Sequence, residues 1–348
     1  TEIYTLSLHD ALPIWYASAN SLAHLRRELP VEEYYRQVGS GENYRYWEPL
    51  RYHDYCPMSD GVAAVILTSK PQDVLVSGLG SATDIPTIAD RKYFHSFPAT
   101  VIASSYAYGM AGIRDIRKLE GCVHINMHDP FNGFGPINLV DLGVVGRNRL
   151  FDAMLDDDLT GPSGAFPTNL TGGLKGRGHP LGATGMIQIV ENHQLMRERE
   201  FSAAISHSIG GPINNNVVVL LEKVSHFNVR ANEPYRPWGL PSLGKPKPKG
   251  VTVEYLLGSS TGVRGKFVTA TTRYNYKTAT PEIVIIIVSI TSDGSSHRFL
   301  FGLDGSASSV VSALNAGDEI FIERKDGELA VNKIPVRRFY RRDRKSVV

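Results

Sequence analysis

The amino-acid sequence predicts two domains of different class, an α/β layered domain followed by a small all-β barrel. From 71 to 223 strand-like and helix-like segments alternate, which is typical of a sheet covered by helices. The stretch 224–250 is rich in proline, glycine and lysine, so it predicts an exposed linker. Over 251–336 the pattern changes to short strands separated by turns, as in a barrel. A length of 348 residues accommodates two or three such domains.

The α/β region is predicted from runs of apolar residues and their period. The stretch 97–113 is apolar on nearly every side, which favours a buried helix. The predicted strands are 75–76, 123–127, 203–205 and 217–221. The predicted helices are 97–113, 138–142, 150–155 and an apolar-periodic run from Met186 to Met196. In a sheet of this kind, the loops that carry active-site residues are expected at the carboxyl ends of the strands.

The barrel is predicted from six short strands and the turns between them. These strands are 251–256, 265–273, 283–290, 297–301, 319–324 and 329–333. Turn sequences such as Ser292-Asp293-Gly294 and Asp326-Gly327 separate them. A glycine before a long strand and a late Gly-Asp-x-Ile-x-Ile segment resemble the oligonucleotide/oligosaccharide-binding (OB) barrel that accompanies some thiolase-like, acyl-CoA-associated proteins. The linker has no cysteine, so the zinc ribbon that often precedes such a barrel is missing.

A glycine-rich loop that carries His179 is the most informative segment for chemistry. Glycine is costly inside a helix or strand, so its density over 172–185 indicates a loop that bends tightly or lets a ligand approach its backbone. Pro180 fixes the backbone after His179, and a helix is predicted to follow. An imidazole at the positive end of a helix suits a developing negative charge. A phosphate loop would need Gly-Lys-Ser/Thr at the helix start, which this loop does not have.

Four motifs of the α/β region together resemble the thiolase family. The loop matches its Asn-x-x-Gly-Gly…Gly-His-Pro-x-Gly-x-x-Gly signature, from Asn169 to Gly185. The other motifs are the stretch from Cys56 to Leu67, the box His128-Asp129-Pro130-Phe131, and the loop Ser206 to Pro212. The His-Asp-x-Phe box is typical of the sterol-carrier-protein type. The resemblance covers roughly residues 17–223 and implies a thiolase-like layered fold that is truncated at the amino terminus, with 15–70 as the end of the amino-terminal thiolase half.

The resemblance implies roles for the residues at the matching positions. His179 is expected to be the base and to hold the thioester oxygen of an acyl-CoA, with Asn169 bracing its loop. His128 would position a water or substrate oxygen, and Gly210 would donate its backbone N–H to a second oxyanion hole. His207 is either an acid or a structural hydrogen-bond donor. The expected substrate-binding residues are Gly178, Pro180, Gly182, Gly211 and Phe131.

Two departures from the family pattern affect the predicted reaction. Ser208 stands where many thiolases carry their acid–base cysteine, and Pro130 stands where some sterol-carrier-type members have one. Neither side chain shuttles a proton as a thiol does. The two cysteines of the chain, Cys56 and Cys122, are both predicted to be buried thiols. The nucleophilic cysteine of a thiolase lies in residues that would precede this chain.

The two ends of the chain are predicted to derive from a DNA-sequencing adapter and not from the gene. Residues 1–14 are the translation of a sequencing-adapter string, and 343–348 translate the reverse complement of its end. The natural polypeptide is therefore expected to run from about Trp15 to Arg342, with its missing thiolase half upstream. The alternative is an amphipathic leader with a basic tail. Targeting arguments from the amino terminus are excluded accordingly.

Composition narrows the class of protein and its partners. With 42% hydrophobic and 21% charged residues and a formal charge of +2, a soluble, cytoplasmic protein is expected, and no polyanion partner is required. No apolar run long enough to span a membrane occurs, and two cysteines make no zinc cluster. No metal or cofactor is expected beyond the coenzyme A of the substrate. Nucleic-acid binding through the basic end that includes Arg337 and Arg338 is the weaker alternative to a solvated face.

Three functions follow from these observations. The leading hypothesis is an acyltransferase of the thiolase type that forms or cleaves a carbon–carbon bond in a 3-oxoacyl-CoA. The second is an aldol-cleaving relative acting on a bulky, sterol-type acyl-CoA. The third is a non-catalytic acyl-CoA-binding or assembly subunit. The chain is expected to form a homo-oligomer, or a hetero-complex through its barrel, and to be inactive without the missing half.

Overall fold

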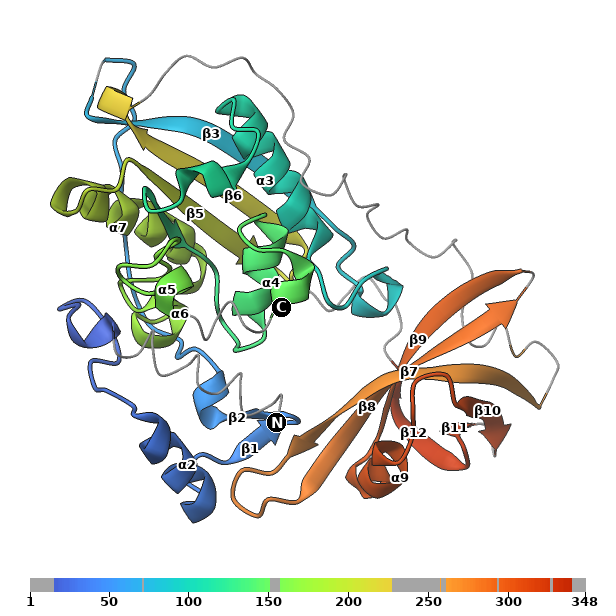
Figure 1. Ribbon diagram of the computed structural model, residues 1–348. Helices are drawn as coiled ribbons and strands as arrows, with labels where there is room; N and C mark the ends of the chain where they lie inside the picture. The colour runs from blue at the N-terminus through green and yellow to red at the C-terminus, as the bar shows by residue number, and fades with distance from the viewer. Residues whose placement is uncertain are drawn as a thin grey trace. The chain divides into compact units, whose positions relative to one another are not determined.

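The computed structural model describes residues 16–70, 72–150, 157–226, 257, 261–292, 294–325 and 328–339 of the chain (Figure 1). These residues fall into two compact units. The α/β unit takes its residues from Thr1–Ser40, His53–Pro86 and Lys92–Leu243, and the barrel unit from Gly41–Tyr52, Thr87–Arg91 and Gly244–Val348. The predicted helical stretch 150–155, the strand 251–256, most of the linker and both chain ends lie outside the described residues.

The α/β unit is built on a four-stranded mixed sheet. In spatial order its strands are β3 (Val74–Thr83), β6 (Asn215–Lys223), β5 (Ala203–Gly210) and β4 (Val123–Asn126). β4 and β5 run parallel, whereas β3–β6 and β6–β5 are antiparallel. Each of these strands overlaps one of the predicted strand segments, so the predicted layered fold is confirmed in this unit.

Helices α3 (Pro98–Met110) and α7 (Thr184–Glu198) cover opposite faces of this sheet. Successive residues of a strand point to opposite faces. Val218 packs in the hydrophobic cluster to which α3 contributes, and Val219 packs in the cluster to which α7 contributes. The ribbon in Figure 1 shows the two helices on either side of the strands.

Two glycines of β3 let α3 approach the sheet closely. A Cβ atom at Gly80 would lie 1.8 Å from the carbonyl oxygen of Ala103, and one at Gly78 would lie 2.1 Å from that of Ala107. Real Cβ atoms do not come so near to a carbonyl oxygen, so these positions exclude any side chain unless the helix shifts. The tight packing of glycine against alanine fixes α3 on its face.

The remaining helices of the α/β unit are short and carry the loops around the sheet. The α-helices are α2 (Val31–Ser40), α4 (Phe134–Asp141), α5 (Asp157–Thr160) and α6 (Gly173–Gly176). The 3-10 helices of both units are η1 (Tyr52–Asp54), η2 (Ile88–Asp90), η3 (Ile116–Leu119), η4 (Arg147–Arg149), η6 (Leu181–Ala183), η7 (Val224–His226) and η8 (Gly305–Ala307). α4 contains most of the helix predicted at 138–142, and it begins four residues earlier.

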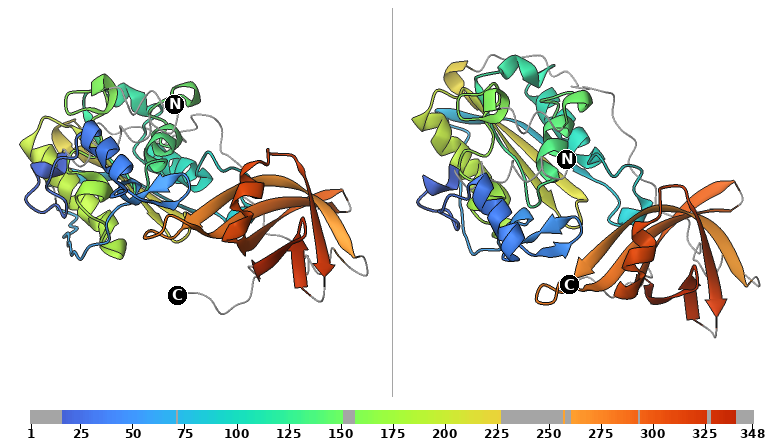
Figure 2. Two further views of the ribbon diagram at one scale, coloured as in Figure 1. Left: turned by 90° about the horizontal axis from the view of Figure 1, so that it is seen from below. Right: turned by 60° about the horizontal axis from the view of Figure 1, so that its bottom comes forward.

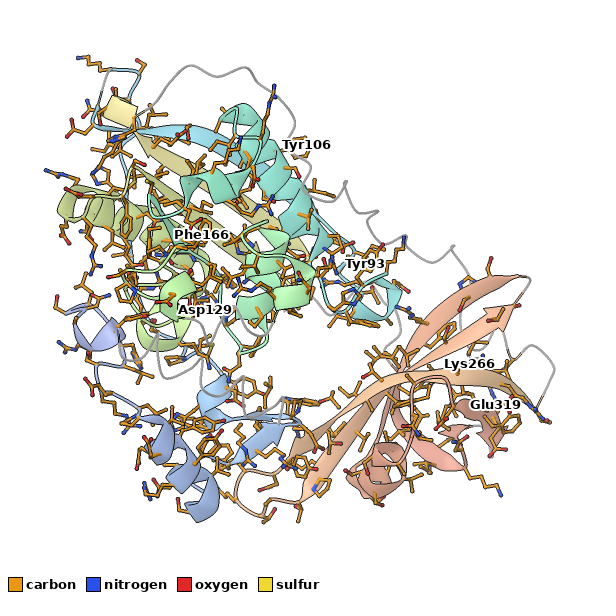
Figure 3. All side chains as sticks on the ribbon, in the orientation of Figure 1. Tyr93, Tyr106, Asp129, Phe166, Lys266 and Glu319 are labelled. Atoms are coloured by element: carbon orange, nitrogen blue, oxygen red, sulfur yellow. The ribbon has the colours of Figure 1, made fainter. Side chains whose placement is uncertain are left out.

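The barrel unit closes a ring of six antiparallel strands (Figure 2). The strands are β7 (Gly262–Tyr274), β8 (Pro281–Ser292), β9 (Ser295–Asp304), β10 (Glu319–Lys325), β11 (Glu328–Val331) and β12 (Ile334–Phe339). They pair in the order β7-β8-β9-β12-β11-β10, and β10 pairs back with β7, where Glu319 lies opposite Lys266 (Figure 3). Helix α9 (Ser308–Ser312) connects β9 to β10. The predicted OB-like barrel is confirmed.

Two details of the barrel differ from the sequence prediction. The segment 329–333 is not one strand, because Asn332 and Lys333 have φ of +47° and +67° and form the turn between β11 and β12. A hairpin of β1 (Arg45–Trp47) and β2 (Leu50–Arg51), which the sequence did not predict, joins β7 through Trp47 and Arg273. Its strands are too short to show a period of two.

Candidate functional site

The structure brings the two predicted catalytic histidines together. The ring centroids of His128 and His179 are 5.1 Å apart, and the rings are nearly perpendicular at 82°. His128 follows the carboxyl end of β4, and His179 follows α6 on the glycine-rich loop. This is the end of a parallel strand pair, where loops of an α/β sheet carry ligand sites.

The backbone around His179 is held by a neighbouring segment. Its N–H donates to the carbonyl oxygen of Pro57 at 3.0 Å, and its own carbonyl accepts from the N–H of Ser59 at 3.4 Å. At Gly178 φ is +108°, and a Cβ there would lie 2.6 Å from the Ser59 hydroxyl. Gly178 therefore serves the close approach of two backbones. The ring Nδ1 lies 2.7 Å from the hydroxyl oxygen of Thr184, at the start of α7.

The surroundings of both histidines favour the neutral form of the ring. Burial lowers the pKa of the half-buried His179, and the charge of Arg177 lowers it further. For the buried His128, burial again lowers the pKa well below its ordinary value, and the neighbouring His179, His207 and Arg177 lower it further. A neutral imidazole accepts a proton, so either ring has the protonation state of a general base.

Asn169 ties the glycine-rich loop to the end of β4. Its backbone has φ of +51°, and its side-chain oxygen accepts the N–H of Met127 at 2.8 Å. Its own N–H donates to the carbonyl of Ile125 at 2.9 Å, and its carbonyl accepts the N–H of Gly172. These contacts fit the bracing role that was predicted for Asn169.

Asp129 lies buried beneath the same loop (Figure 3). One carboxylate oxygen accepts the N–H of Leu174 at 2.7 Å. A Cβ at Gly173 would lie 2.4 Å from the other oxygen, so the loop needs glycine there. Burial raises the pKa of Asp129 to about 7, against the lowering effect of that hydrogen bond and of Arg177.

His207 lies on the face of the sheet that α3 covers. The Thr100 hydroxyl donates to Asn216, so the His207 Nε2–H, 3.1 Å away, donates to the Thr100 oxygen. Burial lowers the pKa of His207 to about 3. Its neighbour Ser208 points to the opposite face, where a Cβ at Gly185 would lie 3.1 Å from the Ser208 hydroxyl. The described contacts therefore place Ser208, rather than His207, beside the start of α7.

The other predicted residues are spread around the loops. Gly210 ends β5 and is exposed, and Gly211 follows with φ of +60°. Gly182 is exposed and has no atom within 4 Å of a Cβ position, whereas Pro180 packs against Gly61. Phe131 stacks edge-on against Tyr55, with centroids 5.3 Å apart.

The two cysteines differ in exposure. Cys56 is half-buried, and burial raises the pKa of its thiol to about 11. Cys122 is exposed, so the prediction that both thiols are buried is wrong for Cys122. It lies in the turn just before β4 begins and not within the strand.

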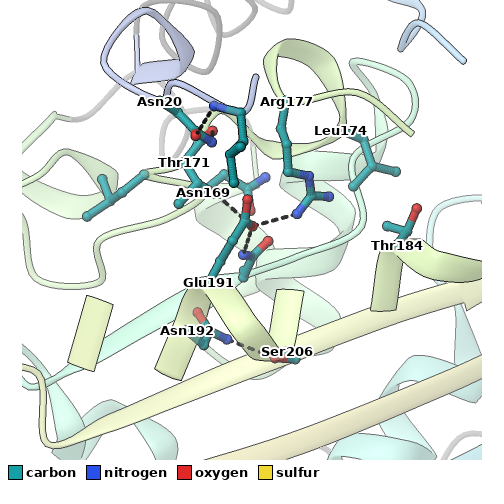
Figure 4. Close-up of polar contacts among 12 residues, drawn as sticks. Asn20, Asn169, Thr171, Leu174, Arg177, Thr184, Glu191, Asn192 and Ser206 are labelled. Carbon is teal, nitrogen blue, oxygen red and sulfur yellow. Dashed lines mark hydrogen bonds and ion pairs between the residues drawn. The ribbon is translucent and has the colours of Figure 1, made fainter. Parts of the chain in front are cut away.

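Sequence reasoning missed a polar network on the inner face of α7 (Figure 4). One oxygen of Glu191, Oε2, accepts the Asn126 amide at 2.9 Å, the Thr171 hydroxyl at 2.9 Å and the Arg177 guanidinium at 2.6 Å. The Asn192 amide nitrogen donates to the hydroxyl of Ser206 at 2.8 Å. The sequence signal that could have revealed this polar face is the helical spacing of four polar residues of α7. These residues, all buried, are Thr184, Gln188, Glu191 and Asn192.

The same face of α7 fixes a third histidine. His124 in β4 accepts the N–H of Leu170 on Nε2 at 3.3 Å, so its Nδ1–H donates to the Asn192 oxygen at 2.7 Å. Burial lowers the pKa of His124 to about 4, which keeps this ring neutral. The pairing fixes one tautomer and holds Leu170, next to Asn169, against the strand.

Comparison with known proteins defines the class of the α/β unit. Residues 80–223 match the family described as Thiolase C-terminal domain-like. The chain therefore carries a thiolase C-terminal domain-like region, and its α/β unit is thiolase-like.

Individual relatives agree with this class. The chain is 37% identical over 182 residues to the acetyl-CoA acetyltransferase of Methanothermobacter thermautotrophicus, covering 47% of this chain and 45% of that protein. It is 32% identical over 190 residues to sterol carrier protein 2 of Bos taurus, covering 49% of this chain and 33% of the relative. The matched region thus spans less than half the length of either relative.

Two solved structures share the fold. A monomeric SCP2-thiolase-like protein type 1 from Mycobacterium smegmatis superposes with a TM-score of 0.60 at 19% identity, covering 95% of this chain and 68% of the other. The Ltp2-ChsH2(DUF35) aldolase superposes with a TM-score of 0.50 at 18% identity, covering 63% and 58%.

The described ranges contain neither a metal-binding cluster nor a membrane-spanning helix. No group of three or more His, Cys, Asp or Glu residues there is arranged to hold a metal ion. Among the helices of the described residues, none has both the length and the apolar character needed to cross a membrane.

Proposed function

We propose that this chain belongs to an acyl-CoA enzyme that forms or cleaves the carbon–carbon bond next to a thioester carbonyl. The single observation that carries the proposal is the close pair of imidazoles, His128 and His179, 5.1 Å apart between ring centroids. Such a reaction needs a base near neutral pH and donors for a thioester or enolate oxygen. The acetyl-CoA acetyltransferase relatives support the same class.

In this proposal His179 and His128 have different roles. His179 receives support from Thr184 through Nδ1, which leaves Nε2 to face the reacting groups. His128 Nδ1 is buried and has no hydrogen-bond partner in the described structure, so an oxygen of the substrate or a water would satisfy it. Asn169 and Gly210 would act as supports, the first through its contacts with β4 and the second by donating its backbone N–H at the exposed end of β5.

The nucleophile is proposed to come from another segment of thiolase-like structure. Cys56 does not suit this role because burial raises the pKa of its thiol to about 11, and a thiolate is the reactive form. The exposed side chains of Val62 and Ile66, at 90% and 95%, offer apolar surface on which such a partner segment would pack. In this proposal the partner is either another segment of the same polypeptide or a second subunit.

The test is turnover of acyl-CoA substrates of short and long chain by this protein together with the partner segment that the proposal requires. Replacing His179 by alanine is expected to lower kcat by about 10²–10⁴-fold, the usual contribution of a general base. His193→Ala is the matched control, because this histidine is exposed on α7. Unchanged turnover in the His179→Ala protein would remove the proposal.

A second reaction, aldol cleavage of a bulky acyl-CoA, is favoured by Ser208. The side chain beside the start of α7 is a hydroxyl and not a thiol, and a retro-aldol step needs acid–base groups but no acyl-cysteine. The aldolase among the structures of similar fold is compatible with this alternative. Trapping a covalent acyl-enzyme during turnover would exclude aldol cleavage, and its absence in a burst experiment would favour it.

A further inference from the structure

We propose that Glu191 is a positioning residue that sets the separation of His128 and His179. The inference rests on the proposed role of that histidine pair. Glu191 contacts neither ring in the described structure, so it would act only through the segments that carry them.

A single carboxylate oxygen of Glu191 is bonded to both of those segments. Oε2 accepts the amide of Asn126, at the end of β4, and the guanidinium of Arg177, on the glycine-rich loop, at 2.9 and 2.6 Å. Asn126 lies two residues before His128, and Arg177 lies two residues before His179. The hydrogen bonds therefore fix the relative position of the two chain segments just ahead of the two rings.

The beginning of the loop is bonded to the same oxygen. The Thr171 hydroxyl donates to Glu191 Oε2 at 2.9 Å, so donors on both sides of α6 converge on one acceptor (Figure 4). Bonds to a charged acceptor are shorter and stronger than those between neutral groups. Movement of the loop away from β4 would break two of these bonds at once.

Helix α7 adds a second contact to the same loop. Thr184 and Glu191 are seven residues apart, which places them on one face of a helix. Thr184 bonds to the ring of His179, and Glu191 bonds to Arg177 just before it. One rigid element thus holds both the ring and the backbone that carries it.

The charge of the Arg177–Glu191 pair is well shielded from water. The two side chains are 4% and 10% exposed. Removing one partner of a buried pair leaves an uncompensated charge, which is expensive. A change that keeps the shape of the side chain is therefore needed to separate positioning from folding.

The experiment compares Glu191→Gln with Glu222→Gln in this protein together with the partner segment that the proposed function requires. Glu222 is also buried, but it lies on β6 opposite Ala203, at the far end of β5 from Gly210. The readouts are the nuclear Overhauser effect between the ring protons of labelled His128 and His179, and kcat and KM with an acyl-CoA. Glu191→Gln is expected to weaken the ring-to-ring effect and to lower kcat by on the order of 10²-fold, with KM changed less than about threefold.

The control separates positioning from general loss of stability. Glu222→Gln is expected to lower the melting temperature while keeping the ring-to-ring effect and kcat. Equal losses of kcat in both variants, or an unchanged ring-to-ring effect in Glu191→Gln, would overturn the proposal.

If Glu191→Gln does not fold, Thr171→Val is the second variant. It removes one uncharged donor and is expected to weaken the ring-to-ring effect by a smaller amount; an unchanged ring-to-ring effect would again overturn the proposal. Failure of the wild-type protein to turn over any acyl-CoA would count against the proposed function alone, because the ring-to-ring effect is measured without substrate.

Discussion

Helices α3 and α7 cover the same four-stranded sheet by two different kinds of packing. On the α3 side, Gly78 and Gly80 lie directly beneath backbone carbonyls of the helix, so the contact depends on the absence of side-chain volume. On the α7 side, Glu191 and Asn192 are buried and bonded to groups of the strand and the loop. The first face depends on shape and the second on hydrogen bonds, and the histidine pair is attached to the second.

Adding a methyl group at Gly80 should have the largest effect on stability. A Cβ in Gly80→Ala would lie 1.8 Å from the carbonyl oxygen of Ala103, so α3 must move. We expect a loss of about 3 kcal/mol or more in the free energy of unfolding. Denaturant unfolding measures it. Gly39→Ala is the matched control, since nothing lies within 4 Å of its Cβ position in α2, and it should be neutral or stabilising. Similar values for both variants would contradict the close-packing argument.

Removing hydrogen bonds from the α7 side should be the next most costly change. Asn192→Leu keeps the volume of the side chain but removes the partner of His124 and Ser206. Leaving these buried groups unsatisfied is expected to cost about 2–3 kcal/mol in chemical unfolding. Gln194→Leu, exposed on the same helix, provides the comparison and should cost less than about 0.5 kcal/mol. If Asn192→Leu also cost less than about 0.5 kcal/mol, the hydrogen bonds of this polar face would not be needed for stability.

Two buried groups, Asp141 beside the start of α3 and His124 beside α7, should respond to pH in opposite directions. Asp141, which accepts the N–H of Phe97 at the start of α3, has its pKa raised by burial to about 6. Its stabilising contribution is present at low pH and is lost as the pH rises through 6, so Asp141→Asn should gain on the order of 1–2 kcal/mol over wild type at pH 8 and nothing below pH 4. His124, with its pKa lowered to about 4, stabilises above pH 6.5 and loses that contribution as the pH falls toward 4. The free energy of unfolding of Asp141→Asn should therefore differ from that of wild type mainly at high pH, and that of His124→Gln mainly at low pH. Curves that run parallel to wild type over the whole range would contradict these pKa shifts.

The smallest effect is expected at an apolar residue of α7 that the structure leaves exposed. Met186 was part of the apolar run that predicted this helix, but it is 36% exposed. Met186→Gln should change the free energy of unfolding by less than about 0.5 kcal/mol. Leu195→Gln, at a buried position of the same helix, serves as the comparison and should be clearly destabilising. A large cost at Met186 would show that the apolar run does face the sheet.

The helix comparison also explains how much could be predicted from the sequence. Apolar runs located all four strands of the α/β sheet, because a strand covered on both faces is apolar throughout. The same signal located α7, but it gave no sign that Glu191 and Asn192 are buried, because their partners are distant in sequence. His128 and His179 could be paired from their motifs, whereas the network beneath them depends on distances that only the folded chain provides.

The β1–β2 hairpin changes how the boundary of the barrel unit should be drawn. Residues 41–52 and 87–91 group with the barrel strands. From the sequence alone, the barrel domain would be taken to begin only after the linker that starts at residue 224. A truncation at that linker would remove β7 and leave Trp47 without the strand residue Arg273 that it faces. An engineered exchange of this barrel between related proteins would therefore have to carry three pieces of sequence, two of them from the first hundred residues.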